Sequence, residues 1–152
     1  GVLLKRLSDN GDREIHGVDI SIPAVEFTNR LIGRGVAQVA EVSSLPFRDG
    51  AFQIVVASEV IEYLRDFEAG LKELHRVLSK SGRLLITTPR PGTRWHLLEA
   101  IWIQLRREPL EFDHSLISPG RLRWGLIKTG FNIHRFESFL FGCEQFIEAV
   151  KE

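Results

Sequence analysis

The stretch VAQVAEVSSLPFRDGAFQIVVASEVIEYLRDFEAGLKELHRVLSKSGRLLITTP, residues 36–89, decides the fold. It contains three apolar runs that are typical of β-strands, at residues 36–41, 52–57 and 83–88. Residues 67–78 between the last two runs have helical periodicity, and Asp66 stands at the N-cap position. Polar residues follow each run, and ligands bind at the carboxyl ends of strands in an open α/β sheet. The stretch therefore predicts both the fold and the edge of the sheet that carries the chemistry.

The flanking sequence continues this alternation. Helices are predicted at residues 2–7, 22–32, 94–106 and 119–128, and strands at residues 14–20 and 131–139. Residues 145–151 fit either a short helix or a last, antiparallel strand that pairs with residues 131–139. Strands that alternate with helices at this spacing predict an α/β, Rossmann-like fold with a doubly wound, mostly parallel sheet.

Bulk composition indicates one globular domain over residues 1–152, with 43% hydrophobic and 26% charged residues. The 20 basic and 20 acidic residues give a formal net charge of zero, so bulk charge does not favour a nucleic-acid partner. Apolar runs fall well short of the roughly 20 residues that span a bilayer, so no membrane span is expected. The single cysteine, Cys143, excludes an internal disulfide and favours a cytoplasmic location.

Asp19 ends the predicted strand of residues 14–20, in the segment GVDIS. A carboxylate at this place can accept two hydrogen bonds from ribose hydroxyls, as in nucleoside-binding sheets. The alternative is an N-cap or surface aspartate. A carboxylate at the end of this strand does not by itself distinguish a site for NAD from a site for another cofactor that contains adenosine.

The order of motifs resembles the class I S-adenosylmethionine-dependent methyltransferases, above all their type 11 group of small-molecule, ubiquinone-biosynthesis-like enzymes. The motifs are GVDIS, VAEVSSLPFRDGAFQIVVASEVIEYL and ELHRVLSKSGRLLITTP. The resemblance is specific over residues 14–89 and weaker from there to residue 139. It implies S-adenosyl-L-methionine as the cofactor and methyl transfer to a small-molecule acceptor as the reaction.

The resemblance also implies roles for the residues that would hold the adenosine. Asp19 would bind the ribose, and Ile20 would pack on the adenine. Glu41 would accept a hydrogen bond from the adenine amino group, and Val42 would offer backbone groups to the ring. Gly1 stands where the family has the last glycine of a glycine-rich loop. We expect the domain to be N-terminally incomplete in this chain, without that loop and without the first strand, which the family places at the centre of the sheet.

The remaining candidates concern the methionine portion of the cofactor and catalysis. On the resemblance, Ser58 and Glu59 would lie near the methionine portion. Methyl transfer needs an in-line nucleophile and sometimes a base, and Glu62, Tyr63 and His114 are the candidate catalytic residues. For His114 the favoured alternative is a surface histidine bonded to backbone. The five histidines are scattered in the sequence, so no metal site is predicted.

Trp95 and Trp102 in the predicted helix of residues 94–106 favour an apolar or aromatic acceptor. The apolar face that they form is equally typical of a helix packed against an ordinary hydrophobic core.

Two other functions are alternatives to methyl transfer. One is a catalytically inactive methyltransferase-like domain that binds or acts as a scaffold. The other is an NAD-dependent oxidoreductase, which explains Asp19 but not the LPF motif and the strand that follows it.

Overall fold

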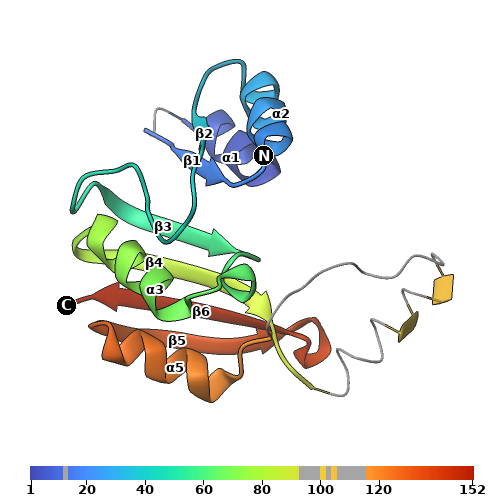
Figure 1. The fold of residues 1–152 in the computed structure, drawn as a ribbon, viewed down its shortest axis with the longest axis vertical. Coiled ribbons are helices and arrows are strands. Elements are labelled where there is room, and N and C mark those ends of the chain that lie inside the picture. Colours follow the sequence, from blue (N-terminus) through green and yellow to red (C-terminus); the bar gives the residue numbers. More distant parts are fainter. Residues whose placement is uncertain (12–13, 93–99, 102–103, 106–115) are drawn as a thin grey trace. The chain divides into compact units, whose positions relative to one another are not determined.

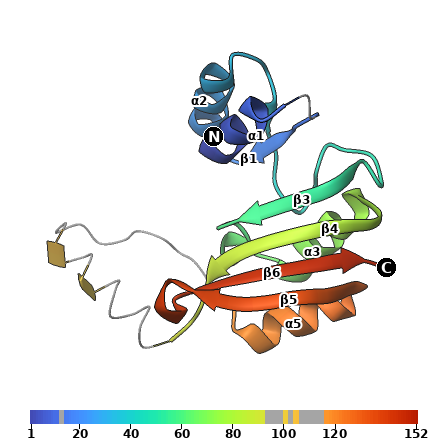
Figure 2. The same ribbon diagram turned by 180° about the vertical axis from the view of Figure 1, so that it is seen from behind.

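The structure is a computed structural model that describes residues 1–11, 14–92, 100–101, 104–105 and 116–152. The chain divides into two compact units, residues Gly1–Pro46 and Phe47–Glu152 (Figures 1 and 2). The single domain expected over residues 1–152 stays a prediction. Most of the helix predicted at residues 94–106 lies outside the described residues.

The first unit packs two helices with a two-stranded parallel sheet. Helix α2 covers the residues predicted for it, because Pro23 lies in its first turn and the Ser21 hydroxyl accepts a hydrogen bond from the Ala24 N–H at 3.3 Å. It ends at Gly33, whose φ of 78° suits glycine. The elements in chain order are α1 (Val2–Asp9), β1 (Gly17–Asp19), α2 (Ile22–Ile32) and β2 (Ala37–Val39).

Both strands of this unit are shorter than the predicted residues 14–20 and 36–41. The side chain of Asn29 explains why β2 starts at Ala37 and not at the predicted residue 36. Its Oδ1 accepts hydrogen bonds from the N–H groups of Val36 and Ala37, at 3.0 and 2.8 Å. These backbone donors are therefore satisfied by a helix side chain instead of by a longer strand ladder.

The second unit is a four-stranded sheet with the order β3-β4-β6-β5. Strand β3 is parallel to β4, and β6 is antiparallel to both β4 and β5, so three strands share one direction. This confirms a Rossmann-like sheet with one antiparallel strand. It also decides between the alternatives for residues 145–151, which form a strand. The elements are β3 (Phe52–Ser58), η1 (Ile61–Tyr63), α3 (Phe67–Val77), β4 (Leu78–Pro89), α5 (Pro119–Lys128), β5 (Phe131–Phe139), η2 (Leu140–Gly142) and β6 (Glu144–Lys151).

Helices α3 and α5 cover the same face of this sheet (Figures 1 and 2). Alternate residues of β4 and β6 point into the resulting core, as the period of two in a strand requires. Removing these apolar side chains from water is the main force that holds the unit together. The fully buried apolar residues among those described are Ile61, Leu71, Leu78, Leu84, Ile86, Leu122, Leu126, Ile147 and Ala149.

The predicted start of the next strand at residue 83 is wrong, because β4 follows helix α3 directly. The helix ends at Val77, and residues 78–89 form one strand with a bend at Ser81, whose φ is 59°. Leu78 lies opposite Phe52, whereas Arg83 already lies opposite Ile54, so the segment between them bulges out of the ladder. A Cβ atom on Gly82 would approach the Ser79 carbonyl oxygen to 2.8 Å.

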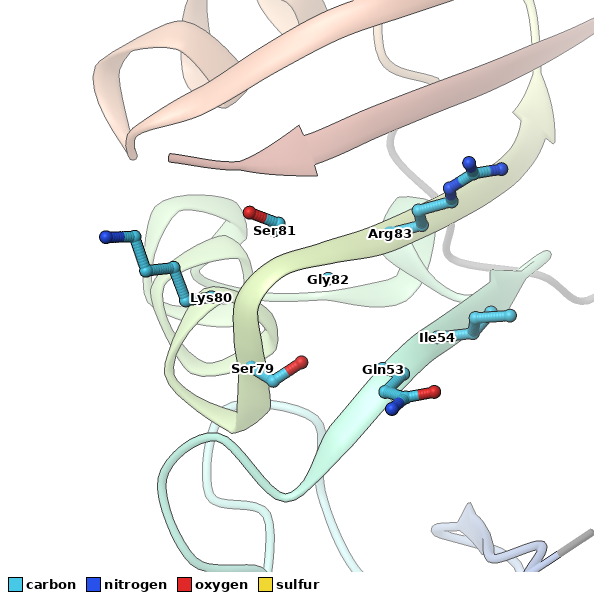
Figure 3. Close-up of a pocket in the computed structure, with 7 residues that line it drawn as sticks. All are labelled: Gln53, Ile54, Ser79, Lys80, Ser81, Gly82 and Arg83. Atoms are coloured by element: carbon cyan, nitrogen blue, oxygen red, sulfur yellow. The ribbon is translucent and has the colours of Figure 1, made fainter.

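This bulge borders a cavity of about 380 Å³, lined by Gln53, Ile54 and residues 79–83 (Figure 3). Lys80 and Arg83 extend in different directions there (Figure 3). The cavity lies at the amino ends of β3 and β4. Ligands in such sheets bind at the carboxyl ends of the strands, so this cavity lies at the end where ligands are not expected.

The contact between α5 and α3 gives a stability prediction. A Cβ atom on Gly125 would lie 2.6 Å from Phe67 Cε1 and 3.0 Å from Leu71 Cδ1, whereas one on Gly120 would meet nothing within 4 Å. Since overpacking a core costs about 1–3 kcal/mol, we expect Gly125→Ala to be less stable than the matched Gly120→Ala by about that amount. Urea unfolding measures the difference, and equal stabilities would contradict the close packing described here.

Candidate functional site

The carboxyl ends of β1 and β2 bring Asp19 and Glu41 to one edge of the first unit. Asp19 is the last residue of β1, and its carbonyl oxygen accepts a hydrogen bond from the Ala40 N–H at 3.1 Å. Glu41 follows Ala40 directly, and both acidic side chains are exposed. The Asp19 Oδ1 atom also accepts a hydrogen bond from the Ser21 N–H at 2.9 Å, which orients the carboxylate at the end of the strand.

Apolar groups accompany these carboxylates. Ile20 is 73% exposed directly after Asp19, which is high for a large apolar side chain. Val42 is half-buried, and the Glu41 carbonyl oxygen accepts a hydrogen bond from the Ser44 N–H at 3.0 Å. Adenosine has ribose hydroxyl donors, an amino donor and apolar ring faces. Two carboxylates beside an exposed isoleucine therefore match it chemically.

Gly1 lies at the N-cap position of α1, and its carbonyl oxygen accepts a hydrogen bond from the Lys5 N–H at 2.9 Å. A Cβ atom at Gly1 would lie 2.8 Å from Thr28 Oγ1 of helix α2. The backbone therefore passes close to α2 at a point where only glycine fits without a shift.

In the second unit, Ser58 and Glu59 lie at the carboxyl end of β3. The Ser58 and Thr87 hydroxyl oxygens are 2.9 Å apart, and the Glu59 N–H donates to the Thr87 carbonyl oxygen at 3.0 Å. Glu59 has a φ of 52°, in the left-handed region that non-glycine residues seldom adopt. Such backbone strain costs on the order of 1 kcal/mol and is concentrated at functional sites.

Glu62 and Tyr63 follow in the turn η1. Glu62 is only 2% exposed, and its Oε2 atom accepts a hydrogen bond from the Thr88 hydroxyl at 2.9 Å. Tyr63 is 48% exposed. Burial raises the pKa of the Tyr63 phenol, and the negative charges of Glu62 and Glu59 raise it further. The phenol is therefore protonated at neutral pH and able to donate a hydrogen bond.

Glu144 belongs to the same region but was not predicted from the sequence. It is the first residue of β6, lies opposite Pro89 of β4 and is 9% exposed. Burial raises the pKa of its carboxyl to about 7, with further contributions from the charges of Glu59 and Glu62. The antiparallel direction of β6 puts its first residue at the edge where β4 ends. The sequence left open whether residues 145–151 form a helix or an antiparallel strand.

His114, Trp95 and Trp102 lie outside the described residues, so their roles stay predictions. Cys143 is buried and free. Within the described ranges, no group of three His, Cys, Asp or Glu side chains could hold a metal ion. None of the helices in those ranges combines the length and apolar character needed to cross a bilayer.

Comparison with known proteins identifies the family. Residues 1–86 match the model of the family described as "Methyltransferase domain". The demethylmenaquinone methyltransferase of Thermus thermophilus is 31% identical over 153 residues, which cover 85% of this chain and 68% of that protein. A ubiquinone/menaquinone biosynthesis C-methyltransferase of Geotalea uraniireducens is 38% identical over 85 residues, and the matched part covers 50% of this chain but only 36% of that protein.

Among solved structures, the PH0226 protein of Pyrococcus horikoshii matches all of this chain and 77% of its own chain, with a TM-score of 0.78 at 19% identity. That likeness shows the fold. Together with the family model, it places this chain in the class I methyltransferase domain family, in the type 11 group. The family and the fold imply S-adenosyl-L-methionine as the cofactor, and the donor set at the ends of β1 and β2 fits its adenosine half.

Proposed function

We propose that this protein transfers a methyl group from S-adenosylmethionine to a small-molecule acceptor. The observation that carries the proposal is the pair of exposed carboxylates, Asp19 and Glu41, at one edge of the first unit, with the exposed Ile20 directly after Asp19. Membership of the methyltransferase domain family supports it. The names of the two relatives state acceptors in quinone biosynthesis for those proteins.

Each residue of this edge has a task in binding. Asp19 accepts hydrogen bonds from the ribose hydroxyls and Glu41 accepts one from the adenine amino group. Ile20 and the backbone at Val42 pack on the ring. Gly1 lets the backbone approach the cofactor. When bound, the cofactor supplies an electrophilic methyl group, so the remaining work of the protein is to orient the acceptor atom in line with it.

The second unit, taken by itself, has polar groups that suit the methionine portion of the cofactor and an acceptor. The family resemblance assigns Ser58 and Glu59 to the methionine portion, and the strained Glu59 backbone is a supporting observation. Tyr63 donates a hydrogen bond from its protonated phenol to the acceptor. Glu62, held by Thr88, is the second candidate catalytic residue of this turn, and its negative charge adds to the raised pKa that burial gives the Tyr63 phenol.

His114 is proposed as the base that removes a proton from the acceptor. We expect His114→Gln to lower kcat at least tenfold, in the range of general-base contributions, while the affinity for S-adenosylhomocysteine stays nearly unchanged. Turnover assays and calorimetry on the same preparation measure both quantities. Equal losses in the two would make His114 a structural residue, and no loss in either would remove it from the site.

An apolar or aromatic acceptor is proposed from Trp95 and Trp102. A cytoplasmic location is proposed from the single, free Cys143.

The direct test of methyl transfer incubates the full-length protein with S-adenosylmethionine and a panel of quinone precursors, phenols and aromatic amines. It measures the S-adenosylhomocysteine that is formed. We expect acceptor-dependent formation that the Asp19→Ala variant reduces. Cofactor binding without product from any acceptor would favour the inactive binding domain instead.

A further inference from the structure

The side chain of Gln145 joins three segments of the second unit. Gln145 is fully buried in β6, and its Nε2 atom donates hydrogen bonds to the carbonyl oxygens of Pro89 and Ile117, at 3.2 and 3.0 Å. Because both acceptors are carbonyl oxygens, the NH₂ end of the amide must face them. Its two hydrogens are thus divided between the last residue of β4 and the residue before the N-cap of α5.

Glutamine is unexpected at this position of the strand. Residues 145, 147 and 149 point to the same face of β6, and Ile147 and Ala149 belong to the apolar core. An apolar residue at position 145 would continue that row, whereas a buried amide costs stability unless it is hydrogen-bonded. The chain therefore has a polar group at the point where it can fix two backbone segments to each other.

The end of β4 that Gln145 fixes also holds a candidate catalytic residue. Thr88 precedes Pro89, lies opposite Gln145 in the β4–β6 ladder, and donates a hydrogen bond from its hydroxyl to Glu62 Oε2 at 2.9 Å. Thr88 is 0% exposed and Glu62 is 2% exposed. Since buried side chains are closely packed, a shift at the end of β4 is passed on to Glu62.

We propose that Gln145 is a positioning residue for methyl transfer, which holds Glu62 in place by fixing the end of β4 to the backbone at Ile117. This inference rests on the proposed function. His114, the proposed base, stands three residues before Ile117 in the sequence, so both segments that Gln145 joins lead to candidate catalytic residues. A misplacement of about 1 Å at a reacting group can cost about a hundredfold in rate. The adenosine half of the cofactor is assigned to the first unit, so its binding does not depend on Gln145.

Lys151, at the other end of β6, offers a matched control. Its Nζ atom also donates to two backbone carbonyl oxygens, those of His75 and Leu78, at 2.7 and 2.8 Å. Leu78 is the first residue of β4, so these hydrogen bonds lie at the amino end of that strand. Lys151→Met and Gln145→Met each remove two such bonds and keep an unbranched side chain. A purely structural role would lower the stability of both variants and leave kcat unchanged in both.

The test measures kcat and KM of the full-length protein with 2-naphthol, an apolar aromatic phenol, and calorimetry measures S-adenosylhomocysteine affinity on the same samples. We expect Gln145→Met to lower kcat about tenfold or more, with the Kd for S-adenosylhomocysteine within about twofold of wild type. Gln145→Glu should also lower kcat, because a carboxylate has a similar shape but no hydrogen to donate. Lys151→Met should keep the wild-type kcat.

Amide hydrogen exchange at Arg90 adds a readout that needs no acceptor. The Arg90 N–H donates to the Cys143 carbonyl oxygen at 2.8 Å, directly after Pro89. Its exchange should be about tenfold faster in Gln145→Met and unchanged in Lys151→Met.

Equal Arg90 exchange in wild type and Gln145→Met, or a wild-type kcat in folded Gln145→Met protein, would overturn the proposal. The wild type tests the proposed function separately. Failure to bind S-adenosylhomocysteine or to methylate 2-naphthol would defeat methyl transfer to a phenol, and the positioning role with it. Success of both, with a wild-type kcat in Gln145→Met, would defeat the positioning role alone.

Discussion

Asp19→Ala is expected to weaken the binding of S-adenosylhomocysteine tenfold or more in the full-length protein. The Asp19 carboxylate is exposed at the end of β1 and is oriented by the Ser21 N–H at 2.9 Å. Hydrogen bonds to charged groups contribute about 1.5–3 kcal/mol each, and a tenfold change in Kd corresponds to about 1.4 kcal/mol. The loss of even one ribose hydrogen bond is therefore enough to produce this effect.

Asp9→Ala is the control for this change. Asp9 is also an exposed aspartate in the first unit, but it lies at the end of α1 and pairs with Lys5. Calorimetry should find wild-type affinity for Asp9→Ala and reduced affinity for Asp19→Ala, with circular dichroism showing that both variants are folded. Unchanged affinity in a folded Asp19→Ala protein would remove Asp19 from the site.

Glu144→Gln is expected to stabilise the ligand-free protein at pH 8 by up to about 3 kcal/mol. The folded-state pKa of Glu144 is about 7, against an ordinary value of 4.5. Between these two values the folded state holds a proton that the unfolded state has lost, so the wild type loses stability as the pH rises from 4.5 to 7. The difference of about 2.5 corresponds to at most about 3 kcal/mol at 1.36 kcal/mol for each pKa unit, because solvent around the carboxyl screens part of the effect.

The measurement is urea unfolding at pH 4 and pH 8, with Glu148→Gln as the control. At pH 4 the carboxyl is protonated in both states, so Glu144→Gln should match the wild type. Glu148→Gln leaves the Glu144 carboxyl in place and should keep the wild-type loss of stability toward pH 8. An equal stability difference between Glu144→Gln and the wild type at both pH values would contradict the raised pKa.

Several elements could be predicted from the sequence because local signals and tertiary packing agree there. Helix α5 covers the predicted residues 119–128, since the Ser118 hydroxyl caps it by accepting from the Arg121 N–H at 3.3 Å and Pro119 stands in its first turn. Strand β5 covers the predicted residues 131–139. Arg76 has a structural role, because its guanidinium donates hydrogen bonds to Glu73, Asp49 and the Phe47 carbonyl oxygen.

Other features depend on pairings that no local pattern encodes. Ser81 and Gly82 are typical of a turn, yet here they bend a continuous strand, because β3 pairs with β4 on both sides of the bulge. The short apolar run of residues 145–151 fitted helix and strand alike, and only pairing with β4 and β5 decides for a strand. Glu144 was not predicted as part of the site for the same reason. Its electrostatic interaction with Glu59 and Glu62 depends on β6 being a strand that pairs with β4.

Titration calorimetry of the full-length protein with S-adenosylhomocysteine, beside a matched titration with NAD, tests the central claim most directly. The Asp19–Ile20 segment alone fits either cofactor, whereas membership of the methyltransferase domain family implies S-adenosylmethionine. We expect S-adenosylhomocysteine to bind with one-to-one stoichiometry and NAD to give no measurable heat of binding. Binding of NAD without binding of S-adenosylhomocysteine would contradict the account.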